Sequence, residues 1–246
     1  MFGKANKLTR KVTGLIKGLW WKILVGVWMS ATIYCAFIVV GPAHGFSMNG
    51  EGAKIIFFHV PSAWLATLSY VVAAFYAIQY LIRQNIESDE KCATSMELGL
   101  VFGLCATVTG SIFSHNEWGK YWSFDPRQTS ILVILLLFTA YLVLRNSITE
   151  PRKRAIISSV YALAALPPAM FLIWVVPRVV ESLHQFANQA VIGDKLGGSY
   201  GPVLYFLALP AFLGLFIWMF QLRMQYYKLY LLNQKMKAEK KQCNLK

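Results

Sequence analysis

The stretch Trp118-Gly-Lys-Tyr-Trp-Ser-Phe-Asp-Pro-Arg-Gln128 separates two long apolar runs and holds four aromatic side chains, two cations and one carboxylate. A connection this short between two membrane-crossing segments ordinarily needs only a few turn-forming residues. Ring faces suit a flat, mostly apolar ligand, and Lys120 and Arg127 supply positive charge for its carboxylates. The stretch therefore predicts a platform for such a ligand at a membrane surface.

The composition of the whole chain is that of a membrane protein with several spans. Hydrophobic residues make up 57% of its 246 residues, charged residues only 14%, and the mean hydropathy is +0.48. The net charge of +13 is spread over the connections between apolar runs rather than gathered in one patch, so nucleic acid is not the expected partner. The four cysteines form no C-x-x-C or C-x-x-C-H motif, which excludes a dithiol reagent and a covalently attached heme.

Six apolar runs of about 20 residues each are long enough to cross a hydrocarbon layer about 30 Å thick. They predict an all-α protein in which residues 1–246 form a single six-span domain. A Trp-rich segment at 115–128 and a loop or helix at 178–201 lie on its outer face. The predicted runs are 21–41, 61–82, 96–114, 126–145, 155–177 and 202–222.

The cations between these runs predict the orientation of the chain. Nineteen Lys and Arg residues fall on the side of the two termini and of the connections 83–95 and 145–154, and five fall on the other side. Positive residues concentrate in cytoplasmic loops, so both termini are expected in the cytoplasm. The same assignment places the Trp-rich segment and all four histidines outside. Of these, His44 and His115 have no supporting neighbours and are expected to be solvated.

His59 lies in Phe57-Phe58-His59-Val60-Pro61, and Pro61 is well suited to the first turn of the second span. An imidazole at that boundary is flanked by rings and partly desolvated, so it stays neutral and can bind iron. Heme is a flat, apolar, carboxylate-bearing ligand that needs such a group. The alternative is an interfacial histidine bonded to a backbone carbonyl.

His184 follows apolar residues at 176, 179, 180 and 183, a helical spacing that continues to 187 and predicts an amphipathic helix at the outer surface. Glu181, one turn earlier, is expected to accept the second ring N–H of His184 and orient the ring. The alternative is a solvated histidine on the polar face of that helix.

Two features of the Trp-rich segment have structural as well as functional interpretations. Asp125, Pro126 and Gln128 have the positions of an N-cap, a first-turn proline and an N3 residue, which together start a helix. Trp118 and Trp122 are four residues apart and share one face if this turn is helical. An aromatic belt at the lipid surface explains one or two such rings without any ligand.

The Trp-rich segment resembles the W-G-x-x-W-x-W-D signature of membrane heme-handling proteins of cytochrome c maturation. Two further motifs, His59-Val60-Pro61-Ser62-Ala63-Trp64 and Ser182-Leu183-His184-Gln185, resemble the first- and second-histidine motifs of the heme exporter protein C (CcmC) family. The number of spans, the chain length and the order of the motifs also agree, so the resemblance covers nearly the whole chain.

The resemblance implies a heme b site on the outer, periplasmic side of the cytoplasmic membrane, with His59 and His184 as axial ligands of the iron. Its platform is the Trp-rich segment, and the residues carried over are Trp118, Gly119, Lys120, Trp122, Asp125 and Arg127. It also implies partners: a CcmE-like heme chaperone, a CcmD-like helper and CcmA- and CcmB-like transporter subunits. The chain is then a heme-transfer protein rather than an enzyme, one that can promote covalent attachment of heme to the chaperone.

The chain departs from the family pattern at Phe124, where the signature has its third Trp, and at Gln128, where Leu is usual. Phe124 keeps the ring face but lacks an N–H donor. The nearest alternative is a CcsA-type heme delivery or cytochrome c synthase subunit, which usually has more spans. A b-type electron-transfer protein is a second alternative, and it would have its histidines inside the spans.

Overall fold

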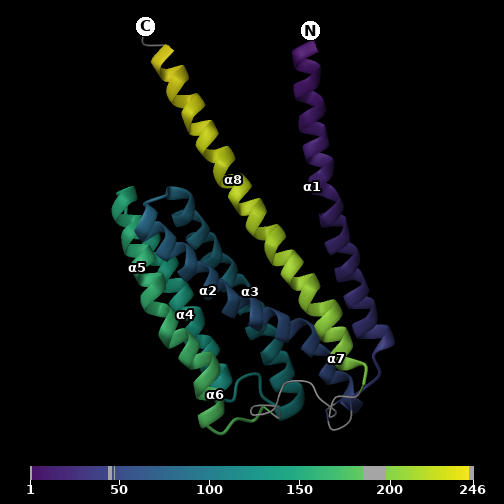
Figure 1. Cartoon of the computed structure of the whole chain (residues 1–246). Helices are drawn as coiled ribbons and strands as arrows, with labels where there is room; N and C mark the ends of the chain where they lie inside the picture. Colours follow the sequence, from purple (N-terminus) through teal and green to yellow (C-terminus); the bar gives the residue numbers. More distant parts are fainter. Residues whose placement is uncertain (1, 44–45, 47, 185–197, 244–246) are drawn as a thin grey trace.

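The computed structural model describes residues 2–43, 46, 48–184 and 198–243. These residues form long helices joined by short connections and contain no β-strand (Figure 1). Element η2 is a 3₁₀-helix, and η1, η3 and η4 are π-helices. In chain order the elements are α1 (Phe2–Tyr34), η1 (Cys35–Val39), η2 (Met48–Ile55), α2 (Ile56–Arg83), α3 (Ile86–Trp118), α4 (Pro126–Ser147), α5 (Pro151–Met170), η3 (Phe171–Val175), α6 (Val176–Val179), α7 (Tyr200–Pro202), η4 (Val203–Ala208) and α8 (Leu209–Cys243).

Six helical stretches in the described part of the chain are long and apolar enough to cross a membrane. Each overlaps one predicted apolar run, so the prediction of an all-α protein with six spans is confirmed. Which end faces the cytoplasm stays a prediction. The six stretches are Gly18–Val39, Gly50–Arg83, Ile86–Trp118, Pro126–Ser147, Pro151–Val179 and Tyr200–Ala238.

The predicted connection at 83–95 is wrong, because only Gln84 and Asn85 separate α2 from α3. The Asn85 side chain accepts a hydrogen bond from the N–H of Glu87 and caps α3 ten residues before the predicted start of the third span. Helix α3 has 33 residues and is therefore about 50 Å long, well beyond the hydrocarbon thickness of about 30 Å.

Acidic residues in the first part of α3 are neutralised by cations from other helices. The Arg145 guanidinium on α4 lies 2.7 Å from the buried Asp89 carboxylate. The Arg223 guanidinium on α8 lies 2.7 Å from the Glu97 carboxylate. These pairs let the charged start of α3 continue as helix inside the bundle, since a buried charge needs a partner.

Helices α2, α3, α4 and α5 pack around one apolar core in which alanines face large rings. The Tyr70 and Phe138 rings lie 4.1 Å apart between α2 and α4. Gly99 on α3 leaves room for the Phe138 ring, because a Cβ at this position would overlap it. Helices α1 and α8 lie beside these four helices and diverge toward the chain termini (Figure 1).

The two ends of the molecule differ in what they carry (Figure 1). Both termini lie at one end, which we call the terminal end, and α6 lies at the other, which we call the α6 end. Near the α6 end the Trp28 indole Nε1 of α1 donates a hydrogen bond of 3.1 Å to the Phe206 carbonyl of η4. Pro210, four residues later, has no N–H to offer that carbonyl in an α-helical pattern.

Candidate functional site

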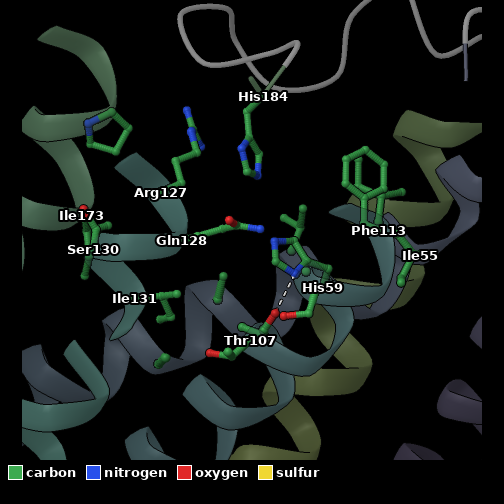
Figure 2. A pocket seen from close by; sticks show the side chains of 18 of the residues that line it. Ile55, His59, Thr107, Phe113, Arg127, Gln128, Ser130, Ile131, Ile173 and His184 are labelled. Atoms are coloured by element: carbon green, nitrogen blue, oxygen red, sulfur yellow. Dashed lines mark hydrogen bonds between the residues drawn. The ribbon is translucent and has the colours of Figure 1, made fainter. Parts of the chain in front are cut away.

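A cavity of about 250 Å³ lies at the α6 end, between α2, α3, α4, η3 and α6 (Figure 2). This volume is close to the lower end of the usual range for small-molecule sites, about 300–1,000 Å³. Its walls are mostly apolar and include the rings of Phe46, Phe113 and Trp122. The polar side chains that line it are His59, Thr67, Thr107, Ser111, Arg127, Gln128, Ser130 and His184.

His59 enters the cavity from α2 and lies directly against α3. Its Nδ1 is 3.0 Å from the Ala106 carbonyl oxygen and 3.1 Å from Thr109 Oγ1. A carbonyl only accepts hydrogen bonds, so Nδ1 carries the proton and the lone pair of Nε2 is left for a ligand. A Cβ at Gly110 would lie 2.9 Å from His59 Cε1, so this glycine gives the ring its place.

The structure corrects the local surroundings of His59. Helix α2 begins at Ile56 and Pro61 lies inside it, so His59 is part of the helix rather than just before it. Pro61 is the sixth residue of α2 and therefore cannot donate the helical hydrogen bond to the Phe57 carbonyl. The predicted alternative, a histidine bonded to a backbone carbonyl, describes Nδ1 correctly and leaves Nε2 for ligand binding.

His184 reaches the same cavity from outside the helices (Figure 2). Helix α6 ends at Val179, and Val180 to His184 are not helical, so the predicted amphipathic helix is wrong over these residues. The remainder of that prediction, from 185 to 197, falls outside the described residues. Both imidazoles line this cavity, although 125 residues separate them in the chain.

Asp125 holds the segment before His184. Its carboxylate accepts hydrogen bonds from the Ser182 hydroxyl at 2.9 Å and from the Leu183 N–H at 2.7 Å. The same carboxylate accepts from the Arg127 N–H and caps α4, as predicted. These bonds replace the helical pattern between Val180 and His184, because they draw the segment onto the start of α4.

Asp125 also occupies the orienting position that the sequence assigned to Glu181. His184 Nδ1 lies 3.3 Å from Asp125 Oδ1, a contact whose alignment falls short of a hydrogen bond, whereas Glu181 is exposed. Burial raises the pKa of Asp125, but His184 and the N–H and O–H donors around the carboxylate more than offset this. The pKa of Asp125 therefore lies well below its usual range.

The two tryptophans do not share a helical face. Gly119 adopts a left-handed conformation, with φ of 74°, and ends α3 directly after Trp118, so Trp122 lies in the following loop. Trp118 packs edge-on against the His184 ring, with centroids 5.2 Å apart. Trp122 lines the cavity. Each ring is still brought to the site, one through His184 and one directly. Phe124, at the third Trp position, is 79% exposed.

The two predicted cations are placed differently. Arg127, in the first turn of α4, lines the cavity (Figure 2). The Lys120 side chain is exposed and does not line the cavity, although the Lys120 carbonyl accepts a hydrogen bond from Ser114 Oγ. The geometry therefore favours Arg127 over Lys120 as a carboxylate partner.

Gln128 and Gly110 belong to the site but were missed as site residues from the sequence. Gln128 is buried, lines the cavity, and accepts hydrogen bonds from the Ser123 N–H at 2.8 Å and the Ser123 hydroxyl at 3.1 Å. It thereby ties the Trp-rich loop to α4. The departure of Gln128 from the family pattern was visible in the sequence, whereas nothing local distinguished Gly110 from other helical glycines.

The site thus combines two imidazoles, one guanidinium and several rings around an apolar space. The described residues contain no group of three or more His, Cys, Asp and Glu side chains suited to a bare metal ion. Two imidazoles on one cavity are a donor set that a metal held in a macrocycle can take from a protein.

The chain is similar to known proteins over most of its length. The sequence model of the family described as heme exporter protein C (CcmC) matches residues 2–242. The heme exporter protein C of Paracoccus denitrificans is 30% identical over 170 residues, which are 69% of this chain and 70% of that protein. The heme exporter protein C of Bradyrhizobium diazoefficiens is 29% identical over 156 residues, 61% of this chain and 56% of that protein.

A third relative is a putative cytochrome c biosynthesis ccmC-like mitochondrial protein of Arabidopsis thaliana, 26% identical over 129 residues. These residues are 52% of this chain and 50% of that protein. Because the family match extends over almost all of the 246 residues, the chain belongs to the heme exporter protein C family, a family of membrane proteins of cytochrome c maturation.

Proposed function

We propose that this protein binds heme between His59 and His184 in the cavity at the α6 end and delivers it to a heme chaperone. The observation that carries the proposal is that these two histidines, distant in the chain, line one apolar cavity. A neutral imidazole with a free Nε2 is a ligand for heme iron, and His59 is held in this form. Two such ligands give a six-coordinate iron with no open position, which suits carriage of heme better than oxygen chemistry.

The apolar walls and Arg127 suit the macrocycle and the propionates of heme. The apolar walls bury the macrocycle at about 25 cal/mol per Å² of apolar surface removed from water. Arg127 lines the cavity and would bind a propionate of heme b, and Trp118 packs against the His184 ring in an edge-to-face arrangement. We assign no side chain of this site the role of a catalytic acid, base or nucleophile. In this proposal the protein transfers heme and can promote its attachment to the chaperone.

Orientation and partners complete the proposal. The excess of Lys and Arg on the side of the termini supports a cytoplasmic location of the terminal end. The cavity then lies on the outer face of the cytoplasmic membrane. Family membership supports a CcmE-like chaperone as acceptor, with a CcmD-like helper and CcmA- and CcmB-like transporter subunits as further partners.

Glycine variants of the histidines test the proposal by absorption spectroscopy of the purified chain with heme. His59→Gly and His184→Gly are each expected to retain less heme and to leave a position that added imidazole fills, restoring a six-coordinate spectrum. His115→Gly is the matched control, because this exposed ring stacks on Tyr121 and does not line the cavity. A full, unshifted six-coordinate spectrum in the His59 or His184 variant without imidazole excludes that residue as an axial ligand.

A further inference from the structure

The two histidines are held in unequal ways. His59 is held by α3 through three residues that we call the α3 seat: Ala106, Thr109 and Gly110. The Ala106 carbonyl and the Thr109 hydroxyl both lie within 3.1 Å of Nδ1, and Thr109 Oγ1 itself donates to the Cys105 carbonyl at 2.7 Å. Gly110 has no side chain, and a Cβ at this position would press against His59 Cε1. Helices α2 and α3 are also the most extensively contacting pair of elements.

Among the residues that the structure describes, none forms a hydrogen bond with the His184 ring nitrogen Nδ1. His184 lies outside the helices, and its ring Nδ1 is 3.3 Å from the Asp125 carboxylate without the alignment of a hydrogen bond. Its side chain is 25% exposed, and its ring packs against Trp118 in an edge-to-face arrangement. The segment before it is held by Asp125 through Ser182 and Leu183. One carboxylate therefore accounts for most of its placement.

We infer that His59 is the anchoring ligand of the cargo and His184 the releasable one, with Asp125 as the positioning residue that sets how readily His184 leaves. This inference rests on the proposed function. His59 lies on a packed helix, and the contacts of its Nδ1 with two oxygen atoms of α3 fix the orientation of its ring. A ligand on a short irregular segment moves when the contacts of one carboxylate are lost. A heme acceptor that approaches from the side of the partly exposed His184 therefore displaces His184 while His59 still holds the iron.

The difference in how His59 and His184 are held can be tested in the heme-free chain. Histidine ¹⁵N resonances of the full-length protein in detergent report the ring tautomers and surroundings. His59 is expected to be the Nδ1–H tautomer. Gly110→Ala is expected to move the His59 resonances and leave those of His184, and Asp125→Asn the reverse. Asparagine can still cap α4, so this variant weakens the contacts of residue 125 with the segment before His184 without removing the cap of the helix. His184 resonances that do not respond to Asp125→Asn overturn the assignment of Asp125.

The order of release is tested on the reduced, heme-loaded chain by the rate at which carbon monoxide replaces a protein ligand. Loss of a residue that orients a metal ligand typically changes metal affinity about 10- to 100-fold. Asp125→Asn is expected to raise the replacement rate about tenfold, because the Fe–His184 bond breaks before the Fe–CO bond forms. Gly110→Ala is expected to lower the amount of heme retained, because it disturbs the ligand that stays.

The control for this experiment is Lys228→Ala, an exposed position on α8, far along that helix from the α6 end. A replacement rate that Gly110→Ala raises more than Asp125→Asn reverses the order of release and overturns the inference, as does a rate that neither variant changes. A chain that binds no heme defeats the proposed function instead, and the resonances of the heme-free protein then still decide whether the seats are unequal.

Discussion

The Arg145 guanidinium on α4 and the Asp89 carboxylate on α3 are joined by two parallel hydrogen bonds of 2.7 and 2.8 Å, and both residues are buried. Glu90 lies 3.2 Å from the same guanidinium and 3.4 Å from that of Arg223 on α8. One ionic cluster thus connects three spans near the start of α3.

Removing one member of this pair is expected to destabilise the protein strongly. Arg145→Met leaves the Asp89 carboxylate buried without its main partner, at a cost of about 3–5 kcal/mol. Thermal unfolding in detergent measures the loss. The double variant Asp89→Leu with Arg145→Met is expected to recover most of the stability, because no charge is then left unpaired. A double variant as unstable as Arg145→Met alone contradicts this account.

Gly99 is expected to tolerate no side chain. Gly99→Ala brings a methyl group into the Phe138 ring and to 2.9 Å from Ser69 Cβ, and overpacking of this kind costs about 1–3 kcal/mol. Gly26→Ala in α1 is the matched control, because no atom lies within 4 Å of the added Cβ and alanine favours helix. Equal unfolding temperatures for the two variants are incompatible with a tight α3–α4 contact at Gly99.

The α6 end is expected to face away from the cytoplasm. In a chain without its native cysteines, Phe124→Cys places a thiol at a position that is 79% exposed in the Trp-rich loop. A membrane-impermeant thiol reagent is expected to label it in intact spheroplasts. Thr149→Cys, in the exposed connection between α4 and α5, is expected to react only after the membrane is opened. The reverse pattern rules out the orientation and the outer heme site together.

The two cations of the Trp-rich segment are expected to differ in their effect on heme. Arg127→Ala removes a charge-assisted contact of about 1.5–3 kcal/mol, which corresponds to about a 10- to 150-fold loss of heme affinity. The Soret position is expected to stay, because the iron ligands are intact. Lys120→Ala is expected to have a smaller effect, since that side chain is exposed outside the cavity. Titration of both variants with heme decides between them, and a larger loss in the Lys120 variant reverses the assignment.

Hydropathy was sufficient to predict the six spans, and local capping chemistry was sufficient to predict where α4 starts. Both depend on residues close together in the chain. The start of α3 was mispredicted because Asp89 and Glu90 are neutralised by Arg145 and Arg223, which come from other helices far along the chain. No pattern within a single span shows that such charges have partners.

The candidate site was predicted in its residue types more fully than in its geometry. The two histidines and Arg127 were singled out and do line one cavity. The contacts that orient the histidines were not predictable, because Asp125 acts across 58 residues on Leu183 and the α3 seat acts across 47 on His59. The left-handed conformation of Gly119 ends α3 between Trp118 and Trp122 and so separates the two rings.

The three π-helical segments, Cys35–Val39, Phe171–Val175 and Val203–Ala208, bear on how chain length can vary among relatives. A π turn holds one residue more than the α turn it replaces, so a one-residue deletion within it restores α-helix and keeps the faces on both sides in register. Elsewhere in a span the same deletion rotates everything beyond it by about 100° and turns the packed face toward lipid. Single-residue gaps in this family should therefore gather at these three places.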